Sequence, residues 1–262
     1  MLLFALSPSC VRLLGGTDAY MAPPVNFLTS VLLPTLSERL GLHVSATLSR
    51  RGFYPRGGGE LALNVMPLSV GTSLPPLLLT ERGELVSVRI TAFAAGKHQL
   101  PVAQRLCSAA KSALEAHAPA LPPGFDAFEM LAVHEPPARA VGDGCGVLCV
   151  ARTSTGAILG SSGLLDRGMS VDDVGAAAGR ELAEALASGA ACDSWLADQL
   201  IVFMALAGGE SRLRAPCPLT MHARTAIAVA QQMTKAVFHV GEYESGSCLI
   251  TCTGACVVRK QE

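Results

Sequence analysis

Apolar positions recur with a helical spacing in one stretch of the chain and alternate with polar positions in the stretches that follow. The helical spacing covers 25–40. The two-residue alternation covers 43–49 and 60–66, on either side of a glycine-rich turn. This pattern predicts one helix followed by a hairpin of two strands.

The same order of elements returns near the C-terminus. A helical pattern covers 221–235, strand patterns cover 236–240 and 247–253, and a turn is predicted between the strands over 242–246. Helix, strand, turn and strand therefore occur twice. This repetition predicts a repeated α/β unit, although an order this coarse also arises by chance.

The region between the two units has a different character. Ser170 is a good N-cap, and Asp173 three residues later makes a variant of the capping box. The pattern predicts helices over 103–117 and 170–187, strands over 127–134 and 146–153, and a proline-rich break over 119–124.

We therefore predict an α/β (α+β) fold with a discontinuous core over 1–96 and 192–262 and an inserted smaller α/β domain over 97–191. A further helix is predicted over 194–207. It is apolar except near its start, so we expect it in the core with one polar end at a surface or cleft.

Composition indicates a globular chain with little net charge. Half of the 262 residues are apolar, 16% are charged and the net charge is −1. Any contact with RNA therefore needs a local basic patch. The apolar start, 1–6, lacks the charged region of a signal peptide. No apolar run approaches the ~20 residues of a membrane span, so we expect a soluble chain.

The nine cysteines include no Cys-x-x-Cys pair. Zinc sites usually need tighter pairs, completed by a second pair or by histidines. We therefore assign no metal-ligating residues and expect buried, reduced thiols that act as small hydrophobic side chains.

Three consecutive glycines make 51–60, Arg-Gly-Phe-Tyr-Pro-Arg-Gly-Gly-Gly-Glu, the most unusual stretch of the chain. Such a run fits a sharp turn or a close approach to a ligand. The flanking Arg50, Arg51 and Arg56 can meet phosphate oxygens. A structural hairpin with solvated arginines explains the same residues. The following Gly-Lys-Ser/Thr of a P-loop is absent.

Thr220 is a good N-cap and places His222 in the first turn of the predicted helix 221–235. The positive end of a helix dipole disfavours a charged imidazole and attracts phosphate groups. A neutral histidine there can attack a phosphorus atom. A helix-end histidine with a structural hydrogen bond is the alternative.

Polar and aromatic side chains meet near the start of the predicted helix 194–207. Asp198 and Gln199 can hydrogen-bond a ribose or orient the ring of His222, and Trp195 can stack on a purine base. A polar helix start beside the only tryptophan of the core explains these residues equally well.

Four motifs, in order along nearly the whole chain, resemble the RNA 3′-terminal phosphate cyclase family. They are Gly15-Gly16-Thr17-Asp18 with Ala22-Pro23-Pro24, the Arg-to-Glu stretch 51–60, Leu196-Ala197-Asp198-Gln199-Leu200 through Phe203-Met204-Ala205-Leu206-Ala207, and Leu219-Thr220-Met221-His222-Ala223-Arg224-Thr225-Ala226-Ile227. The resemblance is weakest in the inserted region and at the extreme C-terminus.

The resemblance implies a large domain of three repeats, each with a pair of helices on a four-stranded sheet, and a smaller inserted α/β domain. The two units predicted above then correspond to the second and third repeats. The first repeat is expected to be missing, together with the family's Gly-Gly-Gly-Gln motif.

The resemblance also implies an activity. The family uses ATP, with a divalent metal such as Mg²⁺ or Mn²⁺, to convert an RNA 3′-phosphate into a 2′,3′-cyclic phosphate. Its histidine takes AMP from ATP and passes it to the RNA 3′-phosphate. The neighbouring 2′-hydroxyl then closes the ring and releases AMP.

Residues are assigned by position. His222 is the implied nucleophile, and Trp195 stands where the family commonly has tyrosine. Arg51 and Arg56 are the candidates for RNA phosphates. The residues expected to border the nucleotide are Asp198, Gln199, Trp195, Pro23 and Pro24.

Two alternatives stay open. A non-catalytic cyclase-like factor of small ribosomal subunit assembly shares the fold but lacks the nucleophilic histidine. A chain without the first repeat can also be an inactive product with an exposed apolar face. The expected partners are RNA 3′-phosphate ends and ATP, without a membrane or an obligate protein partner. The expected location is the nucleus, or also the cytoplasm.

Overall fold

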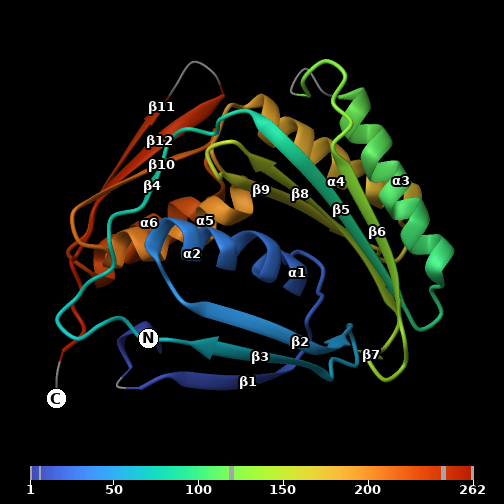
Figure 1. Ribbon diagram of the computed structural model, residues 1–262, viewed down its shortest axis with the longest axis horizontal. Coiled ribbons are helices and arrows are strands. Elements are labelled where there is room, and N and C mark those ends of the chain that lie inside the picture. Colours follow the sequence, from blue (N-terminus) through green and yellow to red (C-terminus); the bar gives the residue numbers. More distant parts are fainter. Residues whose placement is uncertain (1, 6, 118–120, 243–245, 261–262) are drawn as a thin grey trace.

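Three four-stranded sheets, with helices between and outside them, make up the computed structural model of the chain (Figure 1). The structure describes residues 2–5, 7–117, 121–242 and 246–260. The α/β (α+β) fold class predicted from the sequence is confirmed. Parts of two predicted segments, 119–120 of the proline-rich break and 243–245 of the last turn, lie outside the described residues.

The first sheet lies next to one long helix. The helix runs without a break over 25–40 as α1 (Val25–Phe27), a π-helical turn (Leu28–Leu32) and α2 (Leu33–Leu40). A short 3₁₀ turn (Leu2–Phe4) precedes the sheet. In spatial order, the strands are β1 (Ser9–Gly15), β3 (Gly59–Val65), β2 (Val44–Gly52) and β7 (Ala140–Val141).

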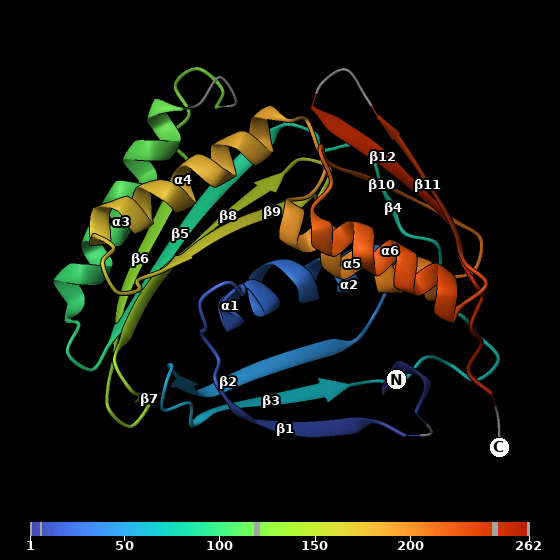
Figure 2. The ribbon, with the colours of Figure 1, turned by 180° about the vertical axis from the view of Figure 1, so that it is seen from behind.

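The second sheet and its helices come mainly from the C-terminal part of the chain. Helices α5 (Ser194–Leu206) and α6 (Met221–Met233) pack against each other beside this sheet (Figure 2). In spatial order, the strands are β11 (Val237–Glu242), β12 (Ser247–Thr253), β10 (Glu210–Pro216) and β4 (Leu78–Leu79).

The third sheet is covered on its outer face by α3 (Leu100–Ala116) and α4 (Val171–Ala187) (Figure 2). Ser170 caps α4 by accepting the Asp173 N–H at 3.0 Å, as predicted. In spatial order, the strands are β6 (Phe128–Glu135), β5 (Leu85–Ala95), β8 (Gly144–Thr153) and β9 (Ile158–Leu164).

Two large apolar cores lie between these layers. One surrounds the helix 25–40 and α5, draws on residues of all three sheets, and includes Phe27, Leu200 and Ile250, all nearly or completely buried. The other lies between the third sheet and its two helices. No disulfide joins the nine cysteines, all of which fall in the described ranges, and six of them are buried.

The helix and strand pairs predicted at both ends of the chain are present. β2 pairs with β3, and β11 with β12, each antiparallel and each after a helix. The sequence patterns did not predict β1, β4, β5, β7, β9 or β10. β5 ends at Ala95, just before the predicted domain boundary, yet it pairs with β6 and β8 of the predicted inserted domain. The division into 1–96, 97–191 and 192–262 stays a prediction.

The glycine-rich turn between β2 and β3 is held by close backbone packing. A Cβ at Gly52 would lie 2.3 Å from the Gly59 nitrogen and 2.5 Å from the Gly15 oxygen. Gly57 and Gly58 have φ angles of 61° and 72°, the left-handed region that favours glycine. The ends of β1 and β2 and the start of β3 meet here, and their close approach requires glycine at 52, 57 and 58.

We expect Gly52→Ala to destabilise the protein by about 2–3 kcal/mol, because the added methyl group meets backbone atoms that cannot move aside. Gly241→Ala in β11 is the matched control, since a Cβ there meets nothing within 4 Å. Urea denaturation followed by circular dichroism measures both. Equal losses in the two variants would contradict the close packing of the turn.

Candidate functional site

The start of α5 is fixed by a buried carboxylate. Asp193 caps the helix: Oδ1 accepts the Leu196 N–H at 2.9 Å, and Oδ2 accepts the Gly160 N–H of β9 at 2.7 Å. Burial raises the pKa of Asp193 to about 7, although both N–H donors favour the carboxylate. This residue ties the helix that carries Trp195 and Asp198 to the third sheet.

A second carboxylate joins α5 to the start of α6. The Thr220 hydroxyl donates to Asp198 Oδ1 at 2.6 Å and accepts the Ala223 N–H at 2.9 Å. Thr220 is thus the N-cap predicted from the sequence. Burial raises the pKa of Asp198, whereas the Thr220 hydroxyl and the nearby His222 side chain oppose that rise.

His222 lies in the first turn of α6, and its side chain is exposed. Asp198 is hydrogen-bonded to Thr220, the N-cap of the same helix and two residues before His222, so its carboxylate lies at the helix end that carries His222. The structure therefore brings His222 and Asp198 together at the positive end of a 13-residue helix. Such a helix end attracts phosphate groups.

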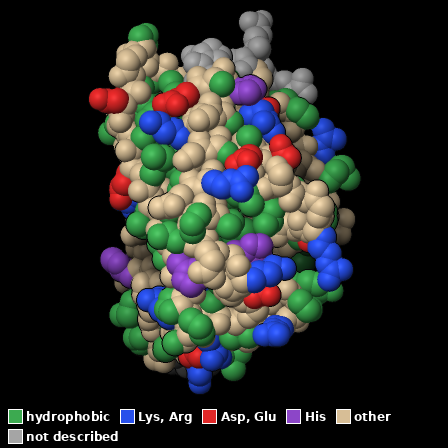
Figure 3. Space-filling model, turned by 90° about the vertical axis from the view of Figure 1, so that its right-hand side faces the viewer, with side chains coloured by type: hydrophobic (Ala, Val, Ile, Leu, Met, Phe, Trp, Pro, Cys, Tyr) green, Lys and Arg blue, Asp and Glu red, His purple; other side chains and the backbone are tan. Residues whose placement is uncertain are grey.

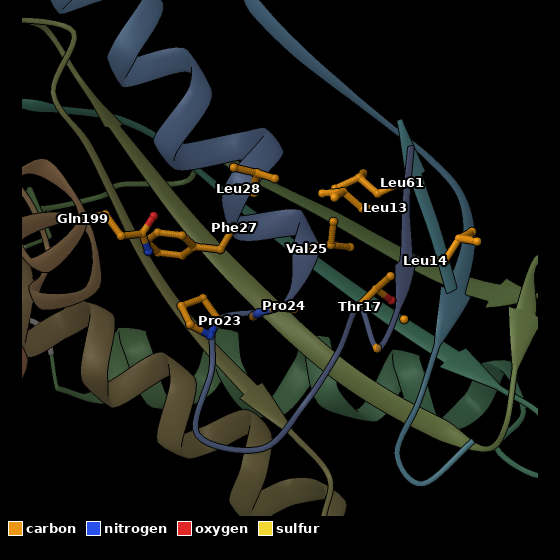
Figure 4. Close-up of a pocket in the computed structure, with 12 residues that line it drawn as sticks. Leu13, Leu14, Thr17, Pro23, Pro24, Val25, Phe27, Leu28, Leu61 and Gln199 are labelled. Carbon is orange, nitrogen blue, oxygen red and sulfur yellow. The ribbon is translucent and has the colours of Figure 1, made fainter. Parts of the chain in front are cut away.

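A pocket of about 330 Å³ lies between the loop after β1, the start of α1, β3 and α5 (Figure 4). Gln199 reaches from α5 towards Phe27 and Pro23 in this view. Pro23, Pro24 and Gln199, three of the predicted nucleotide-site residues, line this one pocket. The other lining residues are Leu13, Leu14, Gly15, Gly16, Thr17, Val25, Phe27, Leu28 and Leu61.

Trp195 lines a neighbouring hollow of about 180 Å³. The two pockets share one loop, because Ala19–Ala22 line the hollow at Trp195 and Pro23 and Pro24 line the pocket at Gln199. The loop 19–24 thus separates the aromatic side chain from the pocket that holds Gln199.

Arg51 occupies a different position from the one predicted. Its side chain is only 4% exposed, and its Nη1 lies 3.1 Å from Asp18 Oδ1. Its Nε donates to Glu135 at 3.0 Å, and its Nη2 to Asn26 at 2.6 Å. The guanidinium also lies 3.8 Å from the centre of the Phe93 ring. These contacts give Arg51 an internal structural role in place of the predicted phosphate contact.

Arg56 does extend to the surface, as a phosphate-binding residue must. It is exposed, and in the part of the chain that the structure describes its guanidinium has no hydrogen-bonded partner. Arg50, half-buried on the outer face of β2, donates from Nε to the Gly58 carbonyl at 2.8 Å. Of the two predicted phosphate contacts, Arg56 remains the candidate.

Several residues that organise the site were not predicted from the sequence. Asp193 is an Asp before a helix, which is an N-cap signal. Asp18, Asn26 and Glu135 carry no local signal, because their common partner is Arg51, 25 to 84 residues away. Only the folded chain brings them together.

Within the described ranges, no three His, Cys, Asp or Glu side chains come together in a way that holds a metal ion. Among the helices described, none has the length and apolar character needed to cross a membrane.

Comparison with known proteins gives one consistent result. A model of the RNA 3′-terminal phosphate cyclase family matches residues 1–240. An RNA 3′-terminal phosphate cyclase of Drosophila melanogaster is 33% identical over 260 residues, which are 99% of this chain and 69% of the relative. Those of Staphylothermus marinus and Hyperthermus butylicus are 36% and 37% identical, over 88% of this chain and 62% of each relative. The chain therefore spans 62–69% of the length of these relatives.

We expect Arg51→Met to destabilise the protein by about 3–5 kcal/mol at pH 8, because it leaves the Asp18 carboxylate buried without its cation. Burial already raises the pKa of Asp18, and Arg51 opposes that rise. Without Arg51 the folded state binds a proton more readily than the unfolded state, so stability recovers as the pH falls towards 4.

Urea denaturation between pH 8 and pH 5 measures this effect, with Arg51→Met combined with Asp18→Asn as the control. The double variant should lose less stability and depend less on pH. A pH-independent loss in Arg51→Met would contradict the role of the buried ion pair.

We expect Thr220→Val to cost about 1–2 kcal/mol, because it removes a helix cap and the donor to Asp198. Thr220→Ser keeps the hydroxyl and most of the stability. Thr225→Val, at an exposed position of the same helix, is the control and should have little effect. Thermal unfolding and hydrogen exchange of the Ala223 amide check this ranking, which a uniform loss would refute.

Proposed function

The chain belongs to the RNA 3′-terminal phosphate cyclase family, and we propose that it takes AMP from ATP onto His222 and uses it to close an RNA 3′-phosphate into a 2′,3′-cyclic phosphate. The observation that carries this proposal is the exposed His222 in the first turn of α6, the helix whose N-cap Thr220 is hydrogen-bonded to Asp198. The relatives are RNA 3′-terminal phosphate cyclases by name. The activity of this chain is our inference.

His222 is suited to act as a nucleophile. Its ring is accessible, as an attacking group must be. The positive dipole end of the helix beside it favours the phosphates of ATP. We assign to Asp198, which accepts from the Thr220 hydroxyl, the role of orienting the imidazole.

The nucleoside part of ATP has two concave surfaces available. Pro23, Pro24 and Gln199 line the pocket beside α5, and Trp195 offers an aromatic face in the neighbouring hollow. An amide that hydrogen-bonds a ribose or base, together with apolar walls, is the usual composition of a small-molecule site. We assign the nucleoside to this region of α5 and the loop 19–24.

The proposed reaction balances in three steps. A ring nitrogen of His222 attacks the α-phosphorus of ATP, and the bond to the β-phosphate oxygen breaks to release pyrophosphate. An oxygen of the RNA 3′-phosphate then attacks the same phosphorus and breaks the P–N bond. Finally the 2′-hydroxyl, losing its proton, attacks the activated 3′-phosphorus and AMP leaves. A phosphate monoester is a poor electrophile until AMP serves as its leaving group.

A divalent cation, Mg²⁺ or Mn²⁺, is part of the proposal, and the described residues include no group of three or more His, Cys, Asp or Glu side chains that could hold it. Magnesium usually binds through one or two carboxylates plus substrate phosphates. We propose that it arrives with the ATP. A nuclear location also remains a proposal.

We expect the protein to become labelled when incubated with ATP that is radioactive at the α-phosphate, and the label to be acid-labile, as a phosphoramidate is. His222→Ala should abolish the label, because no other residue replaces the nucleophile. His239→Ala, which removes another exposed histidine on β11, should retain it. Gel autoradiography before and after acid treatment checks this outcome.

Asp198→Asn should retain partial labelling with a slower rate, because the amide cannot stabilise a positive charge on the ring. A folded His222→Ala variant that still takes up the label would refute the assignment. A folded wild-type chain without any label would leave a non-catalytic relative of the family, such as an inactive or purely binding form.

A further inference from the structure

The turn between β2 and β3 presents two large side chains to solvent. Tyr54 is 86% exposed, more than any other large hydrophobic side chain described, and Arg56 beside it is also exposed. Neither has a hydrogen-bonded partner within the described ranges. Aromatic side chains usually bury most of their surface, so a tyrosine at this exposure requires an explanation.

The backbone on either side of Tyr54 is anchored by hydrogen bonds and by close packing. Phe53 is buried, and its ring packs against Gly144, where a Cβ would lie 2.2 Å from the ring. The Phe53 N–H donates to the Val141 carbonyl at 3.0 Å, and the Gly57 N–H to the Phe53 carbonyl at 2.8 Å. The turn is therefore anchored on both sides of Tyr54, and its exposed ring is held out on a fixed support.

The surroundings of Tyr54 are basic. Arg50 and Arg56 flank the turn, and Arg139, 58% exposed, follows β6 on the neighbouring segment. Two nearby acidic side chains are paired, Glu60 with Arg12 and Glu135 with Arg51. The exposed Asp143, on the segment that packs against Phe53, accepts the Lys97 N–H. Figure 3 views the molecule from the right-hand side of Figure 1, where Lys and Arg side chains are scattered among Asp and Glu side chains. The local field therefore attracts polyanions in a chain of almost no net charge.

The turn also adjoins the pocket of the proposed nucleotide site. A Cβ at Gly57 would lie 3.6 Å from the Gly15 carbonyl carbon, and one at Gly59 would lie 2.6 Å from the Thr17 methyl group. Gly15, Gly16 and Thr17 form one wall of that pocket. An extended strand held at Tyr54 can thus pass along this wall to the pocket.

We propose that the Tyr54–Arg56 turn is a platform for single-stranded RNA, on which Tyr54 stacks against a base while Arg56 and Arg50 contact the adjoining phosphates. Base stacking on an exposed aromatic ring, combined with arginines along the backbone, is the common way to hold a single strand without reading its sequence. The 3′-phosphate end then points to the pocket. This inference rests on the proposed function, because it assigns the strand whose end is to be cyclised.

The experiment is fluorescence anisotropy with a 5′-fluorescein-labelled single-stranded oligoribonucleotide that ends in a 3′-phosphate, without ATP and at low salt. We expect Tyr54→Ala to weaken binding by about 5- to 150-fold, the range for loss of one stacked base. Tyr54→Phe should bind as the wild type does, because stacking requires the ring and not the hydroxyl. Met233→Ala, at a side chain 80% exposed on α6, is the control and should have no effect.

Arg56→Ala adds an independent readout. It should lower the slope of log affinity against log salt concentration by about 0.7, the value for one phosphate contact on a single strand. Arg56→Lys should retain the slope. All variants should keep the wild-type melting temperature, because both side chains are exposed and have no hydrogen-bonded partner in the part of the chain that the structure describes.

The outcomes separate this inference from the proposed function. If the wild type takes up AMP but Tyr54→Ala binds RNA as tightly as the wild type, the platform is refuted and the function stands. If the wild type binds RNA through Tyr54 but takes up no AMP, the platform stands and the function fails. A wild type that does not bind the oligoribonucleotide refutes the platform, and the exposed turn then serves a different partner.

Discussion

The buried guanidinium of Arg51 joins β2 to three other segments of the chain, two of which line the pocket at Gln199. One partner, Asp18, lies in the loop after β1, a second, Asn26, opens the helix after that loop, and a third, Glu135, ends β6 of the third sheet. The loop between Asp18 and Asn26 carries the two prolines that line the pocket. A buried charge is stable only when it is paired and hydrogen-bonded, and here that requirement fixes the loop.

A second constraint acts at the helix ends. Asp193 fixes the start of α5 on the third sheet, and Asp198 reaches from α5 through Thr220 to the start of α6. Asp193 accepts a backbone N–H at the start of α5, and the Thr220 hydroxyl, which donates to Asp198, accepts one at the start of α6. His222 is therefore positioned by a chain of hydrogen bonds that begins in the third sheet, while its own ring stays accessible.

The sequence predicted the elements whose signal is local. Ser170 and Thr220 cap the helices where expected, and the helix over 25–40 has the predicted bounds, because capping and helical spacing depend on near neighbours. β5 was not predicted: its second half, 92–95, is buried on both faces and therefore does not alternate. β10 does alternate, with Ser211, Leu213 and Ala215 buried. The two-residue pattern of a strand was therefore present in the sequence, and β10 could have been predicted from it. The placement of Pro23, Pro24 and Gln199 around one pocket depends on the tertiary fold and came from the family resemblance.

The contrast between Arg51 and Arg56 shows what neighbouring residues in the sequence cannot predict, namely which arginine is available to bind phosphate. Both flank the same glycine-rich turn, and both have the side chain suited to phosphate. Which one is available depends on carboxylates distant in the chain: Asp18 and Glu135 neutralise Arg51 inside the protein, and the described structure offers Arg56 no such group. The inner arginine secures the turn, so the backbone beside Tyr54 and Arg56 is anchored while both side chains extend into solvent. A backbone anchored in this way loses little freedom when a ligand binds, and that preorganisation is what distinguishes a binding surface from an ordinary exposed loop.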